Sequence, residues 1–192
     1  VDAAELRAAG FDLTALRAAG FDAAELRLAK FTVTELKAAD FRAQELKAAK
    51  FTASELKPAG FSALELKAVE FDAAQLREAR FNSSQLKAAG FDASQLKASG
   101  FIVSELKAAQ FDALQLKEAG FSASQLKEAA FTALELKAAD FNKADLKAAE
   151  FSAAQLREIG FAERPVYLQL HGDVVEARKT LLGLYKLEPG RT

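Results

Sequence analysis

The chain of 192 residues contains no cysteine, no methionine and no tryptophan, and it has only three prolines and one histidine. Without cysteine there is no disulfide framework, no thiol nucleophile and no thiolate metal site, and the redox compartment stays undetermined. A zinc site needs several histidine or cysteine ligands, which a single histidine does not supply. We therefore expect no metal site.

Long apolar runs and an excess of charge of one sign are also missing. No run approaches the roughly 20 residues that a membrane helix needs, and the first residues do not resemble a signal peptide. The 26 basic and 27 acidic residues leave a net charge of −1, which does not indicate a nucleic-acid or anionic-membrane partner. We expect a soluble protein of undetermined location, compatible with the cytoplasm and without membrane contact.

The sequence does contain a ten-residue unit, repeated sixteen times over residues 1–160. All sixteen phenylalanines stand at the first position of this period. Every sixth position is leucine and every seventh is lysine or arginine. These three columns are the most regular feature of the chain, and they predict a tandem-repeat architecture.

Neither one long helix nor one long strand can align these columns. In an uninterrupted α-helix, ten residues leave successive phenylalanines about 80° apart around the axis. In an uninterrupted strand, the spacing of five residues puts phenylalanine and leucine on opposite faces. The chain must therefore reverse within each unit, which predicts a solenoid whose repeats contact mainly their neighbours.

We expect an all-α solenoid with one two-turn helix per unit, over positions three to nine. Position two is Asp, Ser, Thr or Asn in fourteen units and position five is Glu or Gln in fourteen, the pattern of a capping box. Phenylalanine and leucine then form a hydrophobic staple, and glycine at position ten in seven units suits a left-handed residue after the helix. Position four should be exposed, and position nine, which is mostly alanine, should be buried.

A second fold follows from a family resemblance. Cut every five residues, the repeat region reads Ala-Glu-Leu-Arg-Ala or Ala-Asp-Leu-Lys-Ala, which resembles the Ala-(Asp/Asn)-Leu-x-x units of pentapeptide-repeat proteins. The resemblance implies a right-handed four-sided β-helix, with Leu6 and Phe11 and the small residues Ala4 and Ala9 pointing inward. In four units the small inward position is occupied instead by a large or polar residue, namely Gln44, Leu64, Leu114 and Leu134. The capping pattern favours the helical solenoid.

Pro58, at position eight of its unit, conflicts with a regular helix there. A proline inside a helix removes a hydrogen bond and crowds the carbonyl four residues earlier, here that of Ser54, at a cost of about 3 kcal/mol. We expect this helix to be shortened or kinked. Other exceptions to the pattern are Ala15, Arg42, Ile102, Lys143 and Asp145.

The period divides the chain into two regions. Residues 1–160 form the sixteen-unit decapeptide-repeat solenoid. Residues 161–192 break the period, and a capping box of Asp173 and Glu176 predicts a longer helix that ends before Pro189. We expect this second region to be a linker followed by a capping helix.

The sequence offers no set of catalytic, cofactor-binding or metal-binding residues. His171 precedes a glycine and the predicted capping helix, so a turn or capping role is expected for it. Each glycine of the repeat is isolated, and none forms a phosphate-binding loop. Asp140 and Asp145 arise from the repeat, and we expect them on a solvated capping face. We expect no enzyme and no cofactor.

The seventh-position column, from Arg7 to Arg157, stacks into a basic ridge. We interpret it as a solvated ridge, since acidic residues lie close by and the phenylalanines belong to the core, where they cannot stack on bases. We therefore do not expect nucleic acid as a partner.

We expect a non-enzymatic repeat scaffold for protein–protein interaction or structural assembly. Nothing before Val1 covers the first layer of the solenoid, so its partner is either an unknown protein or a second copy that associates end to end through this uncapped repeat. The family resemblance implies an alternative. Some pentapeptide-repeat proteins mimic duplex DNA and bind type II topoisomerases, although that mimicry needs a strongly acidic face.

Overall fold

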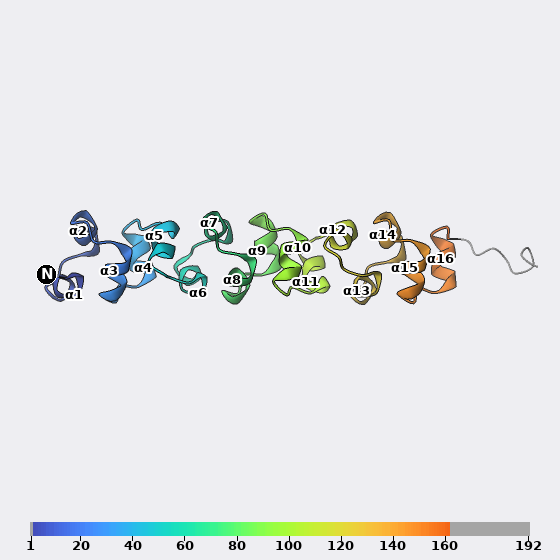
Figure 1. The fold of residues 1–192 in the computed structure, drawn as a ribbon, viewed down its shortest axis with the longest axis horizontal. Coiled ribbons are helices and arrows are strands. Elements are labelled where there is room, and N and C mark those ends of the chain that lie inside the picture. Colours follow the sequence, from blue (N-terminus) through green and yellow to red (C-terminus); the bar gives the residue numbers. More distant parts are fainter. Residues whose placement is uncertain (1, 162–192) are drawn as a thin grey trace, which may run out of the picture.

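The computed structural model describes residues 2–161, which fold into a rod of short helices with no strand among them (Figure 1). The all-α solenoid is thereby confirmed, and the four-sided β-helix is not the fold of these residues. The α-helices are α1 (Ala3–Ala8), α2 (Leu13–Ala18), α3 (Ala23–Leu28), α4 (Val33–Ala38), α5 (Ala43–Ala48), α6 (Ala53–Leu56), α7 (Ala63–Ala68), α8 (Ala73–Glu78), α9 (Ser83–Ala88), α10 (Ala93–Ala98), α11 (Val103–Ala108), α12 (Ala113–Glu118), α13 (Ala123–Glu128), α14 (Ala133–Ala138), α15 (Lys143–Ala148) and α16 (Ala153–Glu158).

Each helix begins after an N-cap residue at position two of its unit. At α3 the side chain of Asp22 accepts a hydrogen bond from the backbone N–H of Glu25 at 2.8 Å. The carboxylate of Glu25 in turn accepts from the N–H of Asp22 at 2.8 Å. This reciprocal capping box satisfies two backbone donors that a helix leaves without partners, and it confirms the interpretation of positions two and five.

Three units with an unusual residue at position two or five keep one half of this capping box, whereas α15, with Asp145 at position five, keeps both halves. At α5 and α11 the N-cap residues are Arg42 and Ile102, which offer no side-chain acceptor. Glu45 still accepts from the N–H of Arg42 at 2.7 Å. At α2 the opposite half remains, because Asp12 accepts from the N–H of Ala15 at 2.7 Å.

Every helix except α6 ends in the same way, with position nine as its C-cap and position ten in a left-handed conformation. After α12, the N–H of Gly120 donates to the carbonyl of Lys117 at 2.8 Å and that of Phe121 donates to Leu116 at 3.0 Å. This pair of bonds is a Schellman motif. Nine units place a non-glycine residue at position ten, with φ between 59° and 66°, where a side chain costs roughly 1–2 kcal/mol.

Pro58 shortens its helix, as expected. Helix α6 ends at Leu56 and a 3₁₀ turn, η1 (Lys57–Ala59), takes the place of its last turn. The N–H of Phe61 then lies 3.4 Å from the carbonyl of Leu56, whereas the equivalent distance in the other units is 2.8 to 3.1 Å. The proline therefore loosens one turn without breaking the rod.

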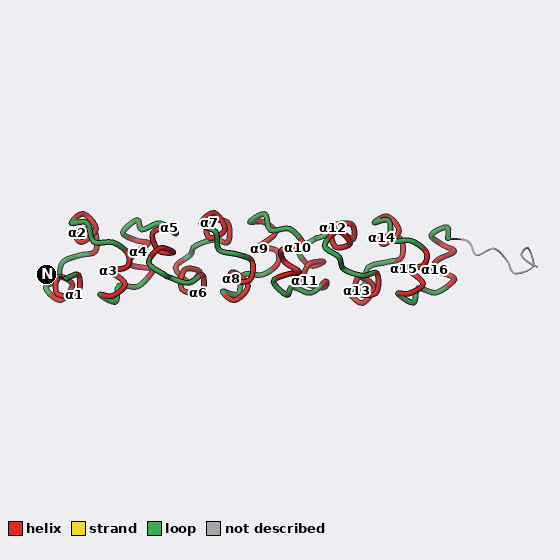
Figure 2. Tube along the Cα trace, viewed as in Figure 1, coloured by secondary structure: helices red, strands yellow, loops and turns green. Residues whose placement is uncertain are grey.

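Helices pack against their next-but-one neighbours, for example α1 on α3, α12 on α14 and α13 on α15. Two units therefore make one coil of the solenoid, and the odd-numbered and even-numbered helices form two stacks. Figure 2 shows the loops crossing from one stack to the other between helices. The stacks also wind around the long axis, since α1 and α13 lie along the lower edge in Figure 1 while α7 lies along the upper edge.

The core runs along the axis of the rod and consists of four columns. Phenylalanine at position one is buried from Phe31 to Phe151 and leucine at position six from Leu16 to Leu156, and position nine is buried or half-buried from Ala29 onward. Position four is exposed in nearly every unit, so both expectations for positions four and nine are confirmed. Sequence reasoning missed position three, which is mostly alanine and is also buried in most units. At this position Ser83, the only buried polar residue among residues 2–161, donates to the carbonyl of Glu105 at 2.7 Å.

The linker and capping helix predicted after residue 161 lie outside the described residues, as does His171. Phe161 itself continues the repeat, because its N–H donates to the carbonyl of Leu156 at 2.8 Å. None of the helices in the described part of the chain is both long and apolar enough to cross a membrane.

The left-handed tenth position gives a paired test of backbone strain. Gly120→Ala should destabilise the chain by about 1 kcal/mol, because a residue with a Cβ atom must then adopt the left-handed backbone conformation. Ala130→Gly, ten residues later at φ 63°, should stabilise it by a similar amount. Urea unfolding of both variants measures the two changes, and a shift of the same sign in both would contradict the strain argument.

Candidate functional site

The seventh-position cations from Arg7 to Lys137 connect successive coils of the rod. Each lies near the end of its own helix, and its head group reaches the C-terminal end of the helix two units further along. Lys107 shows the pattern, since its Nζ donates to the carbonyls of Ala129 at 3.1 Å and Ala130 at 2.6 Å. These carbonyls follow α13, where helix C=O groups lack intrahelical partners and the helix dipole is negative.

The same head groups lie over phenylalanine rings. The Nζ atom of Lys107 is 4.3 Å from the centroid of the Phe131 ring, where the negative ring face attracts a cation by about 0.5–1 kcal/mol, or more when water is excluded. The pairs are Arg7–Phe31, Arg17–Phe41, Arg27–Phe51, Lys37–Phe61, Lys47–Phe71, Lys57–Phe81, Lys67–Phe91, Arg77–Phe101, Lys87–Phe111, Lys97–Phe121, Lys107–Phe131, Lys117–Phe141, Lys127–Phe151 and Lys137–Phe161.

Arginine adds an ion pair in the first three units. Its guanidinium faces the glutamate at position five of the unit whose phenylalanine it covers. The three pairs are Arg7–Glu35 at 3.9 Å, Arg17–Glu45 at 3.7 Å and Arg27–Glu55 at 3.4 Å. Because these side chains are partly exposed, each pair contributes at most about 1 kcal/mol.

These contacts correct the interpretation of the seventh-position column as a solvated ridge. Most of the residues in this column from Arg7 to Lys137 are half-buried, and the head group of each has a backbone acceptor and an aromatic ring within the rod. The column is therefore a set of links between coils. The sequence contained one signal for this role, because position seven never departs from lysine or arginine although solvated positions such as four and eight vary.

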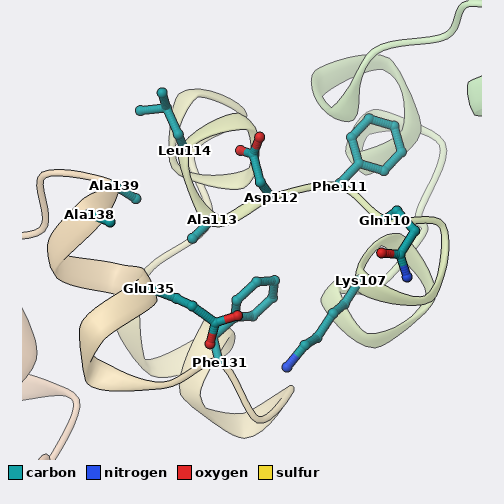
Figure 3. A pocket seen from close by; sticks show the side chains of 10 residues that line it. All are labelled: Lys107, Gln110, Phe111, Asp112, Ala113, Leu114, Phe131, Glu135, Ala138 and Ala139. Carbon is teal, nitrogen blue, oxygen red and sulfur yellow. The ribbon is translucent and has the colours of Figure 1, made fainter.

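A groove recurs on the surface between next-but-one helices. The groove between α12 and α14 is lined by the side chains labelled in Figure 3, which include Lys107, Leu114, Phe131 and Glu135. Lys107 reaches toward the ring of Phe131, whereas Leu114 lies at the opposite rim and points outward. Residues at the same positions of other units line equivalent grooves that include Phe21, Phe31, Phe71 and Phe101.

Large apolar side chains are exposed at several rims. Leu114 is 44% exposed and Leu134 is 63% exposed, and both stand at position four of their units. Because α12 and α14 pack in one stack, these two leucines lie on neighbouring helices of that stack. The other exposed large apolar residues among the described ones are Phe11, Leu28, Leu64 and Ile102.

Three capping glutamates have a pKa below the usual value. For Glu35 and Glu135 the larger cause of the lowered pKa is the backbone N–H of the N-cap threonine, and the threonine hydroxyl is the second cause. For Glu65 the hydroxyl of Ser62 is the larger cause and its N–H the second. Hydrogen bonds donated to a carboxylate favour its charged form. These shifted carboxylates serve helix capping and stand in separate units.

The acidic residues singled out from the sequence have separate structural roles. The carboxylate of Asp145 accepts from the N–H of Asn142 at 2.9 Å at the start of α15. Asp140 ends the preceding unit, and its carbonyl accepts from Lys117 at 2.8 Å. Across residues 2–161, no group of three or more His, Cys, Asp or Glu side chains is placed to hold a metal ion.

Comparison with known proteins identifies the repeat. A family model described as a decapeptide repeat region matches residues 1–73, 51–123 and 100–164, which together span the whole described part of the chain. No curated protein and no solved structure matches. The match confirms a tandem decapeptide repeat.

The lowered pKa values predict acid sensitivity. Because the folded-state pKa of Glu35, Glu65 and Glu135 lies below the unfolded value, their stabilisation is present above the usual glutamate pKa of about 4.3 and is lost as the pH falls through the lowered value. Replacing all three by glutamine, which already stands at this position in other units, should weaken the fall. Thermal unfolding between pH 7 and pH 3 measures this, and an equally steep fall in the triple variant would contradict it.

A double-mutant cycle tests the link between coils. Lys107→Met keeps the aliphatic stem but removes the ammonium, and Phe131→Leu keeps an apolar side chain but removes the ring face. We expect a coupling energy of about 0.5–1 kcal/mol from urea unfolding. The control cycle pairs Lys107→Met with Phe61→Leu, several coils away, and should be additive. Equal coupling in both cycles would show that the ring and the ammonium do not interact.

Proposed function

We propose that this chain, which belongs to the decapeptide repeat region family, is a non-enzymatic scaffold that binds a protein partner along the grooves of its rod. The observation that carries this proposal is the groove that recurs between next-but-one helices. A periodic surface of this kind suits an extended or helical partner segment that lies along the solenoid.

The distribution of regular and variable positions supports a binding role. Positions one, six and seven hardly change from unit to unit, and they build the core and the links between coils. Positions two, four, eight and ten are exposed and vary. Partner selectivity therefore resides in the variable rims of the grooves, while the regular positions maintain the rod.

Exposed leucines supply the apolar contacts that such a partner needs. Leu64, Leu114 and Leu134 all stand at the exposed fourth position, and their helices α7, α12 and α14 lie along one edge of the rod in Figure 1. Central apolar anchors within a polar rim are the usual energetic core of a protein interface. The acidic capping residues around them supply the polar rim.

The alternative function, mimicry of DNA toward a type II topoisomerase, receives no support from this arrangement. It followed from the resemblance to pentapeptide repeats, whose β-helix is not the fold of residues 2–161. It also needs a strongly acidic face, whereas the chain has a net charge of −1.

End-to-end self-association is a second candidate, and one observation favours it. Phe11 is 53% exposed, whereas the phenylalanines from Phe31 to Phe151 are buried. A second copy that covered this ring would remove apolar surface from water, at about 25 cal/mol per Å² of area buried.

Substitution of the rim leucines tests binding along the grooves. Leu114→Ser with Leu134→Ser places at position four a residue that several other units already carry there, so the fold should persist. We expect the wild-type chain, immobilised, to retain a partner from a cell extract and the double variant to lose at least about tenfold of it.

The matched control is Ser84→Ala with Ser94→Ala, at the same position of earlier units. Quantitative mass spectrometry of the retained proteins compares the three chains. A partner whose recovery is unchanged in the leucine variant, or falls equally in the control, would contradict binding at these rims.

A further inference from the structure

The exposed charges of the units that contain α11 to α14 are all of one sign. Between residues 81 and 142 every basic residue stands at position seven. Those from Lys107 to Lys137 are half-buried, and each head group donates to a carbonyl at the end of another helix and lies over a ring. The exposed charged residues of the same units are carboxylates, namely Asp112, Glu118, Glu128, Glu135 and Asp140. A partner therefore meets an acidic surface here, although the net charge of the chain is only −1.

The groove between α12 and α14 places two of these carboxylates beside an exposed leucine. Asp112 and Leu114 both project from the start of α12, and Glu135 projects from α14 toward the ring of Phe131 (Figure 3). Small apolar side chains also line the groove, namely Ala113, Ala138 and Ala139. The groove thus combines an apolar rim, an apolar lining and negative charge on both of its helices.

Both carboxylates use one oxygen for helix capping. Oδ1 of Asp112 accepts from the N–H of Gln115 at 2.8 Å, and Oε2 of Glu135 accepts from the N–H and the hydroxyl of Thr132, both at 2.7 Å. The second oxygens, Oδ2 and Oε1, take no part in these bonds, and Lys107 makes no ion pair with Glu135 within residues 2–161. Each carboxylate can therefore accept a hydrogen bond from a lysine or arginine of a partner while it still caps its helix.

The equivalent groove between α3 and α5 differs in two ways. It has Asp22 and Glu45 at the same two positions, but Glu45 is already paired with Arg17 at 3.7 Å. Ala24 stands where the other groove has Leu114. The units of this groove and its neighbours also carry exposed basic residues outside position seven, namely Lys30, Arg42 and Lys50. Of these two grooves, the one between α12 and α14 is therefore the better site for a ligand that is both basic and apolar.

We propose that the groove between α12 and α14 binds a basic amphipathic segment of a partner protein. A large apolar side chain of that segment packs on Leu114 and the alanines of the groove. Lysine or arginine side chains on either side of it pair with Asp112 and Glu135. This inference rests on the proposed scaffold function, and it identifies one groove and the chemistry of the partner.

Charge favours this occupant over the others that an apolar groove could take. A second copy of the chain would bring its own exposed carboxylates to the groove, and like charges across an interface oppose association. Nucleic acid and an anionic lipid surface would be repelled for the same reason. A basic segment gains ion pairs instead, and long-range attraction to the acidic surface speeds its encounter with the groove.

Selection of peptides from a random displayed library, with the full chain immobilised, tests this inference. Counter-selection against the chain with Leu114→Ser, Asp112→Asn and Glu135→Gln removes peptides that bind elsewhere. We expect the retained peptides to carry lysine or arginine around a large apolar residue. Retained peptides that are neutral or acidic would overturn the basic partner and leave binding along the grooves standing.

Variants then test the two charges with one synthetic peptide from this selection. Asp112→Asn with Glu135→Gln removes both charges and keeps both caps, since Asn82 and Gln115 perform the same capping in other units. We expect fluorescence anisotropy to show a roughly tenfold weaker affinity, from the loss of two partly exposed ion pairs. Leu114→Ser should weaken the affinity by a similar factor.

The matched control makes the same two changes in the groove between α3 and α5. Asp22→Asn with Glu45→Gln should leave the affinity for the peptide unchanged, and circular dichroism should show that every variant retains its helix content. Equal weakening in the two double variants would show that the peptide responds only to the total charge of the chain. That result, or an unchanged affinity in the Asp112 and Glu135 variant, overturns the inference.

The outcomes separate this inference from the proposed function. A wild-type chain that self-associates in sedimentation velocity, and loses this association with Leu114→Ser, would make a second copy the occupant and overturn the basic partner. An extract partner that is lost with the rim leucines but retained by the Asp112 and Glu135 variant overturns the ionic contacts and leaves binding along the grooves standing. Unchanged recovery in the rim-leucine experiment overturns the proposed function, and this inference with it.

Discussion

Each helix of this rod has six residues or fewer, whereas an isolated helix in water needs about 12–15 residues to be even marginally stable. In so short a helix almost every backbone N–H and C=O group belongs to one of the two ends. The structure therefore depends on satisfying these end groups. The capping box does so at the start, the Schellman motif and the left-handed tenth residue do so at the finish, and the cation from another coil satisfies the remaining carbonyls.

The division of tasks among the ten positions follows from this constraint. Phenylalanine and leucine exclude water from the axis, and alanine at positions three and nine lets the coils approach. The seventh-position cation joins successive coils through helices that are not adjacent in sequence. Fewer demands fall on positions four and eight, which is why they vary and why apolar residues such as Leu114 and Leu134 are tolerated there. The variable positions are the part of the surface on which partner specificity can be encoded without loss of the fold.

Much of the fold could be predicted from the sequence, because its signals are local. Asp22 with Glu25 predicts a capping box over three residues, and Pro58 predicts a shortened helix from its own geometry. The buried third position was missed because alanine is also a common exposed residue in helices. The contact of Lys107 with Phe131 was missed for a different reason. It joins residues 24 positions apart, and no local rule gives the number of units in a coil. Without the number of units in a coil, the column of seventh-position cations is predicted to be a solvated ridge. The grooves combine residues from different coils, so they cannot be located from the sequence.

The two-unit coil has a consequence for how the length of such a chain can change. The contacts of the seventh-position cations join each unit to the unit two further along, so loss or duplication of one unit leaves each cation with a carbonyl and a ring to meet. Insertion of an odd number of units, however, moves every later helix into the opposite stack, so the exposed side chains of these helices move to the other flank of the rod. Insertion of an even number of units leaves every later helix in its original stack. Gene duplications of ten codons would thus preserve the fold while exchanging the two flanks, whereas duplications of twenty codons would lengthen the rod and keep each flank's surface intact.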